Sequence, residues 1–324
     1  MITFKDITKT YPDGTTAVDQ FNLTVEKGEF MTLIGPSGCG KTTTMKMINR
    51  LIDPSAGTIY INEKPVSDYS IDALRWNIGY VLQQIALFPH MTVQENIQVV
   101  PELLKWKKGE KEKRTDELLD MVGLDPSIFK KRYPSELSGG QQQRIGVIRA
   151  LAADPDIVLM DEPFSALDPI SREQLQMDID KLQKDIKKTI VFVTHDMDEA
   201  LKMSDRICLM KEGSVVQCGS PEQLMKHPKN DFVEEFIGNR KSAWLTSVQK
   251  VMKNNVPAAH DREPENVMTI PATSTIEDAY AIIQSVNQID FPVVDDNQKT
   301  IGIVTRDELL QYFYQQEKEG ASVL

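Results

Sequence analysis

The sequence predicts an α/β fold in which a largely parallel sheet is flanked by helices, followed by a small α+β domain. Up to about residue 237, β-rich runs alternate with helical ones, and beyond residue 238 the composition shifts. At 324 residues the chain also exceeds what one hydrophobic core usually organises, so we expect two domains. Alternating strands and helices are typical of sheets that bind ligands at the carboxyl ends of their strands.

The first part, residues 1–237, contains the elements that predict this sheet. We expect strands at the β-rich runs 2–7, 30–34, 58–61, 78–82, 157–160, 189–194, 206–211 and 214–218, and helices at 43–51, 140–152, 171–187 and 197–203. The turn sequences at 11–14 and 26–29 favour an antiparallel β subdomain beside the sheet. Between residues 92 and 134 the β signal gives way to charged amphipathic segments, which predicts an inserted helical subdomain.

The second part begins with a linker at 238–255, in which we expect one short helix at 246–253. A compact unit at 256–315 and a tail at 316–324 follow, with strands of the unit expected at 267–270, 290–294 and 301–304. Its first helix should open with a capping box from Ser274 to Glu277, and its last helix with Thr305 and Glu308. A unit of this size buries little surface alone.

Bulk composition excludes several classes of function. No apolar stretch approaches the roughly 18 residues of a membrane-spanning helix, and the first residues lack a signal peptide's apolar segment, so we expect a cytosolic protein. A formal net charge of −11 argues against nucleic acid as a partner, because phosphate backbones are bound by clustered Lys and Arg. Cys39, Cys208 and Cys218 are scattered without metal-ligand spacing, which favours free thiols over a disulfide or zinc site.

A glycine-rich loop follows the apolar run 30–34 and predicts a nucleoside triphosphate site. It consists of Gly35, Pro36, Ser37, Gly38, Cys39, Gly40, Lys41 and Thr42, and a helix continues from Thr43. Glycines let the backbone curl so that its N–H groups and the helix start point at phosphate oxygens. Lys41 would add a charge near the terminal phosphates, and Thr42 offers a hydroxyl to Mg²⁺.

A pair of acids ends the run 157–160, which has the composition of a strand buried on both faces. We expect Asp161 to join the Mg²⁺ shell and Glu162 to polarise the attacking water. For an isolated Asp-Glu pair, two solvated acids before Pro163 would be the simpler interpretation. The glycine-rich loop upstream favours the catalytic one.

A second anion site is predicted at residues 137–141, where Ser138 caps a helix beside Gly139 and Gly140. Its exposed amides can receive an anion, but the γ-phosphate of a nucleotide bound to this chain is already held by Lys41. We therefore expect the segment from Ser138 to Gln141 to act on the nucleotide of a second copy of the chain.

Together these motifs resemble the Walker A, signature, Walker B and D-loop sequences of ABC transporter ATPase subunits, over residues 1 to about 237. The matching segments are 35–42, 137–141, 160–163 and 165–168, and Asp168 is then the D-loop aspartate. The resemblance implies a P-loop ABC ATPase domain with a RecA-like parallel core, an antiparallel β subdomain and a helical subdomain. It also implies ATP and Mg²⁺ as cofactors.

The same resemblance assigns roles to residues outside these motifs. Gln83 would be the Q-loop glutamine that senses Mg²⁺ and the γ-phosphate, with Gln84 as the alternative. His195 would be the switch histidine that contacts the γ-phosphate, rather than an ordinary surface histidine. Tyr11 would stack on adenine, unless it only packs within its hairpin.

In this family two subunits form a head-to-tail dimer, and each nucleotide is held between the glycine loop of one and the signature of the other. The resemblance therefore implies a second copy of the chain and transmembrane permease subunits that dock near the Q-loop. The apolar stretch 85–91 is the candidate docking surface, or alternatively part of the subdomain core. The implied location is the cytoplasmic face of the cell membrane, with an extracellular substrate-binding protein or domain as an indirect partner.

The C-terminal unit resembles one CBS-type module, through residues 291–295 and 302–307. Such modules usually pair, so either residues 240–258 are a degenerate second half or pairing occurs between subunits. Many bind adenine nucleotides through a threonine and an aspartate three positions later; here Thr305 is followed by Glu308, with Asp307 one residue early. A regulatory role is favoured, with a cyclic dinucleotide or an adenine nucleotide as the candidate ligand.

An ABC ATPase with such a tail resembles the ATP-binding subunits of quaternary-amine importers, as do the segments 38–51 and 138–152. The implied function is ATP-driven uptake of an osmoprotectant such as glycine betaine, carnitine or choline. A related exporter, a soluble ABC ATPase of DNA repair or translation, and a ligand sensor with a decayed ATPase are the alternatives. Neither a long coiled-coil insertion nor a second cassette is present, and Lys41, Asp161 and Glu162 are intact, which disfavours the last two.

Overall fold

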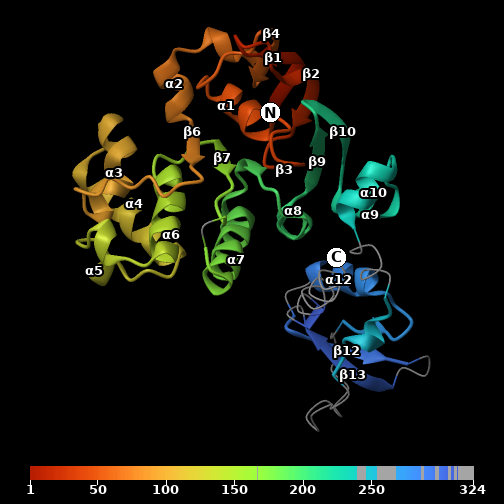
Figure 1. The fold of residues 1–324 in the computed structure, drawn as a ribbon. Helices are drawn as coiled ribbons and strands as arrows, with labels where there is room; N and C mark the ends of the chain where they lie inside the picture. Colours follow the sequence, from red (N-terminus) through yellow and green to blue (C-terminus); the bar gives the residue numbers. More distant parts are fainter. Residues whose placement is uncertain are drawn as a thin grey trace. The chain divides into compact units, whose positions relative to one another are not determined.

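The computed structural model shown in Figure 1 describes residues 1–165, 167–238, 246–253, 268–285, 288–295, 299–305, 308–309 and 312. By its internal contacts the chain forms two compact units, Met1–Lys229 and Asn230–Leu324. The described residues do not include the expected tail at 316–324, Asp307, the linker residues 239–245 and 254–255, or the first residue of the strand expected at 267–270. Within the described part of the chain, no helix has the length and apolar character needed to cross a membrane.

The larger sheet of the first unit has six strands in the order β10–β9–β3–β8–β7–β6. β10 pairs antiparallel with β9, and the other neighbours are parallel. The predicted, largely parallel sheet is confirmed, and each strand begins and ends within one residue of its expected bounds. These strands are β3 (Phe30–Ile34), β6 (Ile78–Val81), β7 (Ile157–Asp161), β8 (Thr189–Val193), β9 (Arg206–Lys211) and β10 (Ser214–Gly219).

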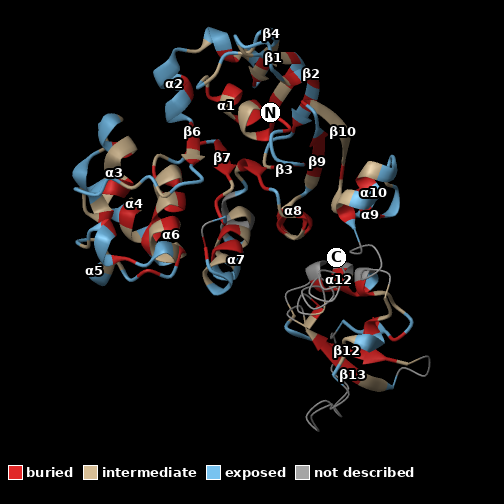
Figure 2. Cartoon of the chain, viewed as in Figure 1, coloured by how far each residue is buried: buried red, intermediate tan, exposed pale blue. Residues whose placement is uncertain are grey.

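Both faces of the central strands are buried, as their apolar sequences predict. Ile157 and Leu159 pack into one hydrophobic core, whereas Val158 and Met160 pack into another. Successive residues of a strand point to opposite faces, so a strand that is apolar at every position needs a cover on each side. In Figure 2, β3 and β7 are accordingly buried along their whole length.

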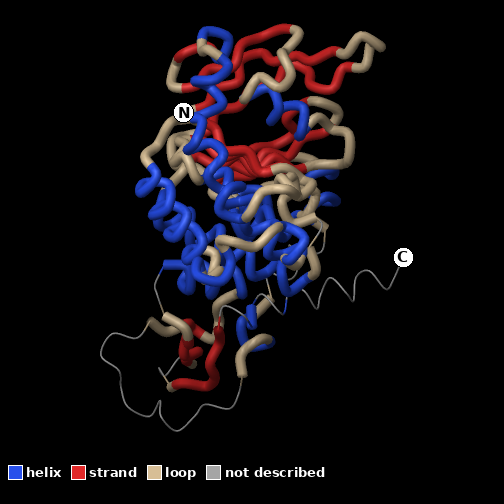
Figure 3. Tube along the Cα trace, turned by 90° about the vertical axis from the view of Figure 1, so that its left-hand side faces the viewer, coloured by secondary structure: helices blue, strands red, loops and turns tan. Residues whose placement is uncertain are grey.

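An antiparallel sheet and helix α1 cover one face. Phe4 and Phe21 of this sheet share a core with Met45 of α1 and with Leu159, and Figure 3 shows the two sheets as separate layers. The antiparallel subdomain is confirmed, although we expected no strand at β2, where exposed polar residues interrupt the apolar ones. The order is β2–β1–β4–β5, with β1 (Ile2–Thr10), β2 (Thr16–Val25), β4 (Ala56–Ile61) and β5 (Lys64–Pro65).

Helices cover the other face. The predicted helical subdomain between residues 92 and 134 is confirmed as α3, α4 and α5, and residues of α3, α4, α6, α7 and α8 share the second core. The helices of the first unit are α1 (Lys41–Ile48), α2 (Ile71–Trp76), α3 (Val93–Leu103), α4 (Lys108–Met121), α5 (Pro126–Phe129), α6 (Gly139–Leu151), α7 (Pro169–Ile186), α8 (Met197–Met203) and α9 (Pro221–Lys226).

The second unit is a small α+β fold with a three-stranded sheet in the order β11–β12–β13. Ile270, Ala279 and Phe291 are fully buried in its core. β11 pairs parallel with β12, and β12 pairs antiparallel with β13. The helices and strands among its described residues are α10 (Asp231–Ile237), β11 (Ile270–Pro271), α12 (Ile276–Ser285), β12 (Asp290–Val294) and β13 (Thr300–Thr305).

Two details of the second unit correct our expectations. The helix expected at 246–253 is only a 3-10 turn at Val248–Lys250, because its flanks form β-bridges with the rest of the unit. The capping box of α12 lies one residue later than expected: Thr275 Oγ1 accepts from the N–H of Asp278 at 3.2 Å, and the Asp278 carboxylate accepts from the N–H of Thr275 at 3.0 Å. The predicted reciprocal bonds between Thr305 and Glu308 are present.

Candidate functional site

The glycine-rich loop joins β3 to α1, and two glycines determine its path. Gly35 and Gly40 have φ of 151° and 101°. A Cβ on Gly35 would lie 2.1 Å from the carbonyl oxygen of Met210, and one on Gly40 would lie 2.3 Å from that of Ala17. Only glycine fits at these two positions unless the backbone moves.

Lys41 begins α1 and lies inside the loop. The residue is 6% exposed, and its Nζ donates to the carbonyl oxygens of Gly35 (2.7 Å) and Pro36 (3.0 Å). A buried ammonium requires such partners, and it is therefore held at the centre of the loop. Around it, the predicted phosphate-binding residues divide into an exposed rim of Pro36, Ser37 and Gly38, the buried Cys39 and Gly40, and the partly exposed Thr42 and Thr43.

The structure brings together Thr42 and Asp161, two of the residues predicted to hold Mg²⁺. Thr42 Oγ1 donates to Asp161 Oδ1 at 2.8 Å, which connects the start of α1 to the end of β7. Burial raises the pKa of Asp161, and the hydrogen bond from Thr42 opposes that shift. The Tyr80 hydroxyl, which we did not predict, lies 3.5 Å from Asp161 Oδ2. Tyr80 is the one residue with a polar side chain in the otherwise apolar β6, and this could have identified it from the sequence.

The three residues predicted to be catalytic converge on one carboxylate oxygen. Glu162 Oε2 accepts from Gln83 Nε2 at 3.1 Å and lies 3.2 Å from His195 Nδ1. Glu162 has a left-handed φ of 45°, and its N–H donates to the carbonyl oxygen of Val193 at 2.9 Å. The ends of β6, β7 and β8 are adjacent in the sheet, which is why side chains distant in sequence meet here.

A buried acid behind His195 escaped the sequence analysis. The Glu199 carboxylate accepts from Thr194 Oγ1, and that hydroxyl accepts from the N–H of Asp196 at 3.0 Å. Burial raises the pKa of Glu199 to about 7. The carboxylate thus connects α8 to the two residues that flank the histidine. The acidic run that follows His195 is the only signal in the sequence.

The signature segment is preformed at the start of α6. Ser138 Oγ accepts from the N–H of Gln141 at 3.3 Å, and Gln141 Oε1 accepts from the N–H of Ser138 at 3.0 Å. Ser138 and Gly139 are exposed, and a Cβ on Gly140 would lie 2.7 Å from Ser171 Oγ. Asp168 caps α7 by accepting from the N–H of Ser171 at 3.0 Å. No hydrogen bond among the described residues joins this segment to the glycine-rich loop.

Tyr11 lies at the turn between β1 and β2. Its carbonyl oxygen accepts from the N–H of Gly14 at 2.9 Å, and the Lys9 ammonium lies 5.4 Å from the centre of its ring. The residue is partly exposed.

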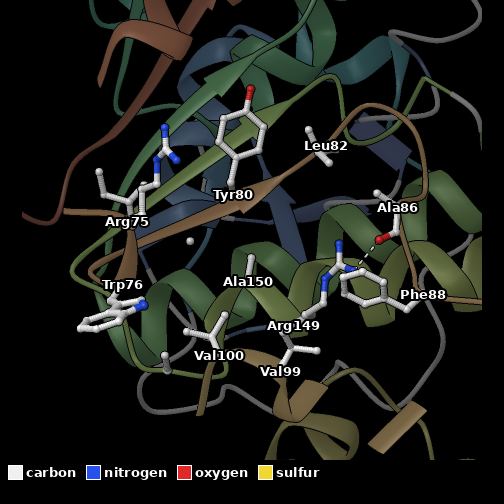
Figure 4. Close-up of a pocket in the computed structure, with 13 residues that line it drawn as sticks. Arg75, Trp76, Tyr80, Leu82, Ala86, Phe88, Val99, Val100, Arg149 and Ala150 are labelled. Carbon is white, nitrogen blue, oxygen red and sulfur yellow. Dashed lines mark hydrogen bonds between the residues drawn. The ribbon is translucent and has the colours of Figure 1, made fainter. Parts of the chain in front are cut away.

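A cavity of about 430 Å³ lies beside the Q-loop, between β6, α2, α3 and α6. Figure 4 shows Arg149 and Phe88 on one side of it and Arg75 and Trp76 on the other. The Arg149 guanidinium donates to the carbonyl oxygen of Ala86, and no acid occurs among the described residues that line the cavity. Within the stretch 85–91, Ala86 and Phe88 line this cavity whereas Leu87 packs on the helical core.

In the second unit, Glu308 forms an ion pair with Lys253 at 2.6 Å. Its carboxylate also accepts from the N–H of Thr305 at 2.8 Å. The position where many nucleotide-binding CBS modules have an aspartate is therefore engaged within the unit.

Comparisons with known proteins agree with these features. Residues 18–165 match the ABC transporter family, and residues 248–315 match the CBS domain. The chain is 50% identical over 304 residues to the choline transport ATP-binding protein OpuBA of Bacillus subtilis, covering 94% of this chain and 78% of that one. It is 47% identical over 330 residues to the carnitine transport ATP-binding protein OpuCA of Listeria monocytogenes, covering 96% and 83%.

A third relative and a solved structure show the same relationship. The osmoprotectant import ATP-binding protein OsmV of Salmonella typhimurium is 48% identical over 292 residues, covering 90% of this chain and 75% of that one. The dimeric structure of MJ0796, a bacterial ABC transporter cassette, superposes with a TM-score of 0.61 at 38% identity, covering 68% of this chain and 99% of that one.

The fold and this site define an ATPase of the ATP-binding cassette class. The chain belongs to the family of ABC transporter ATP-binding proteins, and it carries a C-terminal CBS domain. The predicted family and ATPase activity are thereby confirmed. The exporter, DNA-repair and translation alternatives find no support among these relatives.

Proposed function

We propose that this chain powers the uptake of a quaternary ammonium osmoprotectant, such as glycine betaine, carnitine or choline, by hydrolysing ATP. The relatives named for choline, carnitine and osmoprotectant transport support the substrate class, because each aligns with at least 90% of this chain. The observation that carries the catalytic assignment is the convergence of Gln83 and His195 on the carboxylate of Glu162, beside the Thr42–Asp161 pair.

The residues at the loop fit Mg²⁺. This ion prefers oxygen ligands and is usually held by one or two protein oxygens together with substrate phosphates. Thr42 and Asp161 supply a hydroxyl and a carboxylate oxygen 2.8 Å apart, and Gln83 is the third candidate ligand. When bound, Mg²⁺ would neutralise charge on the phosphates.

The protein's own residues divide the remaining work. Lys41 would exchange its two loop carbonyls for terminal phosphate oxygens, since its ammonium already lies at the centre of the loop. Glu162 would accept the proton of the attacking water. Its hydrogen bond from Gln83 and the nearby His195 keep its carboxylate oriented. His195 is 60% exposed in its side chain, so it is free to reach a γ-phosphate.

A second copy would complete each site. A capped helix start is formed by Ser138, Gly139, Gly140 and Gln141, with Ser138 and Gly139 exposed and no hydrogen bond among the described residues to the glycine-rich loop of the same chain, which supports an action on a partner's ATP. Asp168 lies near this surface because its cap partner Ser171 packs on Gly140. Tyr11, partly exposed at its turn, would stack on the adenine.

The cavity beside the Q-loop is the proposed docking site for the permease subunits. Phe88 is 41% exposed there, and Arg75 and Arg149 give the site a positive charge. An apolar segment with acidic residues would complement this surface. Such docking would place the chain at the cytoplasmic face of the membrane, with the substrate-binding protein or domain reached only through the permease.

The CBS domain would regulate transport, with an adenine nucleotide or a cyclic dinucleotide as the candidate ligand. Calorimetric titration of the full chain with each nucleotide checks this. Binding should survive Lys41→Ala, which impairs the ATPase site but not the CBS domain. If the heat of binding is lost in Lys41→Ala, the nucleotide binds at the ATPase site instead.

Reconstitution tests the main proposal. The chain and its permease, placed in liposomes with a binding protein, should accumulate radiolabelled choline, carnitine or glycine betaine only when ATP is supplied. Glu162→Gln should abolish the accumulation. ATP hydrolysis without uptake of any quaternary amine would contradict the substrate class while leaving the ATPase assignment in place.

A further inference from the structure

Cys208 and Cys218 face each other across the antiparallel pair β9–β10. Cys208 is directly opposite Cys218 in the strand register, and both are free thiols. Opposite residues of antiparallel strands have Cα atoms about 4.5–5.5 Å apart, within the roughly 4.4–6.8 Å that a disulfide spans. Their side chains also lie on the same face of the pair. The backbone therefore already holds the two sulfur atoms where a disulfide could join them.

An arginine is fixed against one of the two thiols. Arg206 Nη2 lies 3.3 Å from Cys218 Sγ, and its Nη1 donates to Glu29 Oε1 at 3.0 Å and to the carbonyl oxygen of Thr24 at 3.2 Å. The two anchors orient the guanidinium with its charge beside the sulfur. Cations near a thiol favour the thiolate, which is the reactive form.

The two thiols are consequently unequal. The hydrogen bond from Cys208 and the charge of Arg206 lower the pKa of Cys218 to about 7. The hydrogen bond to Cys218 and complete burial raise the pKa of Cys208. Cys218 is partly exposed whereas Cys208 is fully buried. Cys218 can therefore meet a soluble oxidant, and Cys208 lies behind it.

From this geometry we infer that Cys218 and Cys208 form a peroxide-responsive modification site in the ATPase domain. The Cys218 thiolate attacks one oxygen of hydrogen peroxide or an organic hydroperoxide; the O–O bond breaks, hydroxide or alkoxide leaves, and Cys218 becomes a sulfenic acid. The Cys208 thiol then attacks that sulfur. The S–S bond forms as the S–O bond breaks, and the released hydroxide takes the thiol proton as water.

The pair is positioned to affect the phosphate loop. In the β9–β10 turn, the N–H of Gly213 donates to the carbonyl oxygen of Cys39 at 3.2 Å. On β9, the carbonyl oxygen of Met210 faces Gly35 so closely that a Cβ there would lie 2.1 Å away. A disulfide fixes the two sulfur atoms about 2.05 Å apart and restrains the strand pair in one geometry. Because the loop has no free space against β9, it should respond to this restraint.

Peroxide titration of the reduced full chain tests the site. Peptide mass spectrometry should find Cys208 linked to Cys218, with the loss of two thiols, both in the wild type and in Cys39→Ala. In Cys208→Ala, a dimedone probe should trap Cys218 as the sulfenic acid. Thiols that stay reduced, a disulfide that includes Cys39, or oxidation that stops at Cys218 in the wild type would each overturn the inference.

Two further measurements separate this site from general oxidative damage. At pH 7, iodoacetamide should alkylate Cys218 faster in the wild type than in Arg206→Gln. At this pH about half of a thiol with a pKa near 7 is present as thiolate, compared with about 3% of a thiol with the ordinary pKa of 8.5. The oxidised wild type should bind ATP about fivefold more weakly, which corresponds to about 1 kcal/mol, and a thiol reductant should restore the affinity. An unchanged alkylation rate in Arg206→Gln would contradict the activation of Cys218 by Arg206. An unchanged ATP affinity after verified disulfide formation would contradict the coupling of the disulfide to the phosphate loop.

Discussion

Replacing Glu162 by Gln should stop ATP hydrolysis and leave the fold intact. The amide oxygen of Gln can keep the hydrogen bond that Glu162 Oε2 accepts from Gln83 at 3.1 Å, but an amide cannot accept a proton from water. General-base catalysis contributes about 10²–10⁴-fold, so turnover should fall at least about 100-fold, or about 2.7 kcal/mol in the barrier.

Stability should change far less than turnover. The Glu162 side chain is 21% exposed, and the variant loses at most one polar contact, to His195. One hydrogen bond is worth about 1 kcal/mol, which shifts Tm by roughly 2–4 °C in a domain of this size. The variant should therefore combine a small change in thermal unfolding with a large loss of phosphate release.

A matched control comes from a second glutamate with the same unusual backbone. Glu212 has φ of 49°, close to the 45° of Glu162, and it is exposed in the β9–β10 turn. Glu212→Gln should hydrolyse ATP at the wild-type rate. Glu162→Gln should also elute as an ATP-bound dimer in gel filtration, because the nucleotide is no longer consumed. A Glu162→Gln protein with wild-type phosphate release would refute the base assignment.

Three further predictions address the loop, the buried acid and the docking cavity. Gly40→Ala should weaken ATP binding by at least about tenfold in calorimetry, because its Cβ would lie 2.3 Å from a backbone oxygen. Gly123→Ala, also at a positive φ but with open space around its Cβ and located between α4 and α5, should bind ATP normally. The pKa of Glu199 is about 7 in the folded protein and 4.5 in the unfolded chain, so between these pH values only the folded protein holds the proton. The free energy of unfolding of the wild type should therefore fall by up to about 3 kcal/mol as pH rises from about 4.5 to 7. Glu199→Gln should lose this slope in urea unfolding at pH 5 and pH 8; an equal slope in both proteins would exclude the buried acid as its cause. Phe88→Ala should reduce co-purification of the chain with the permease. Leu103→Ala, which changes an apolar residue that is 61% exposed outside the cavity, should not. If both variants retain the permease equally well, the cavity is not part of the interface.

Much of the fold could be predicted because its strongest signals are local. The uninterrupted apolar run of β7 requires a packed layer on each face of the strand, and the structure has a hydrophobic core on both faces. The prediction failed at β2, where buried and exposed residues alternate regularly only toward the end of the strand, and at 246–253, where pairing with the rest of the second unit overrides helix propensity. The failure at 246–253 concerns a segment whose partners, Thr275 and Ile303, are distant in sequence, whereas β2 pairs with β1, the strand directly before it.

The motif residues of the candidate site could be found from sequence, but their supporting residues could not. Asp161 and Glu162 follow an unmistakable strand, whereas Tyr80 and Glu199 are single polar residues in apolar or acidic runs. Their proximity to the site depends on the adjacency of β6, β7 and β8, which no local pattern records.

The sequence by itself determined the chemistry of phosphate binding, because glycines, a lysine and a hydroxyl in a short loop have few other physical uses. Only the tertiary structure decided which distant groups meet. Cys208 and Cys218 are scattered thiols in the sequence, yet the register of one strand pair sets them face to face, with Arg206 beside them. Composition and spacing report which groups a chain possesses; sheet order and register, set by burial over the whole domain, determine which of them can react together.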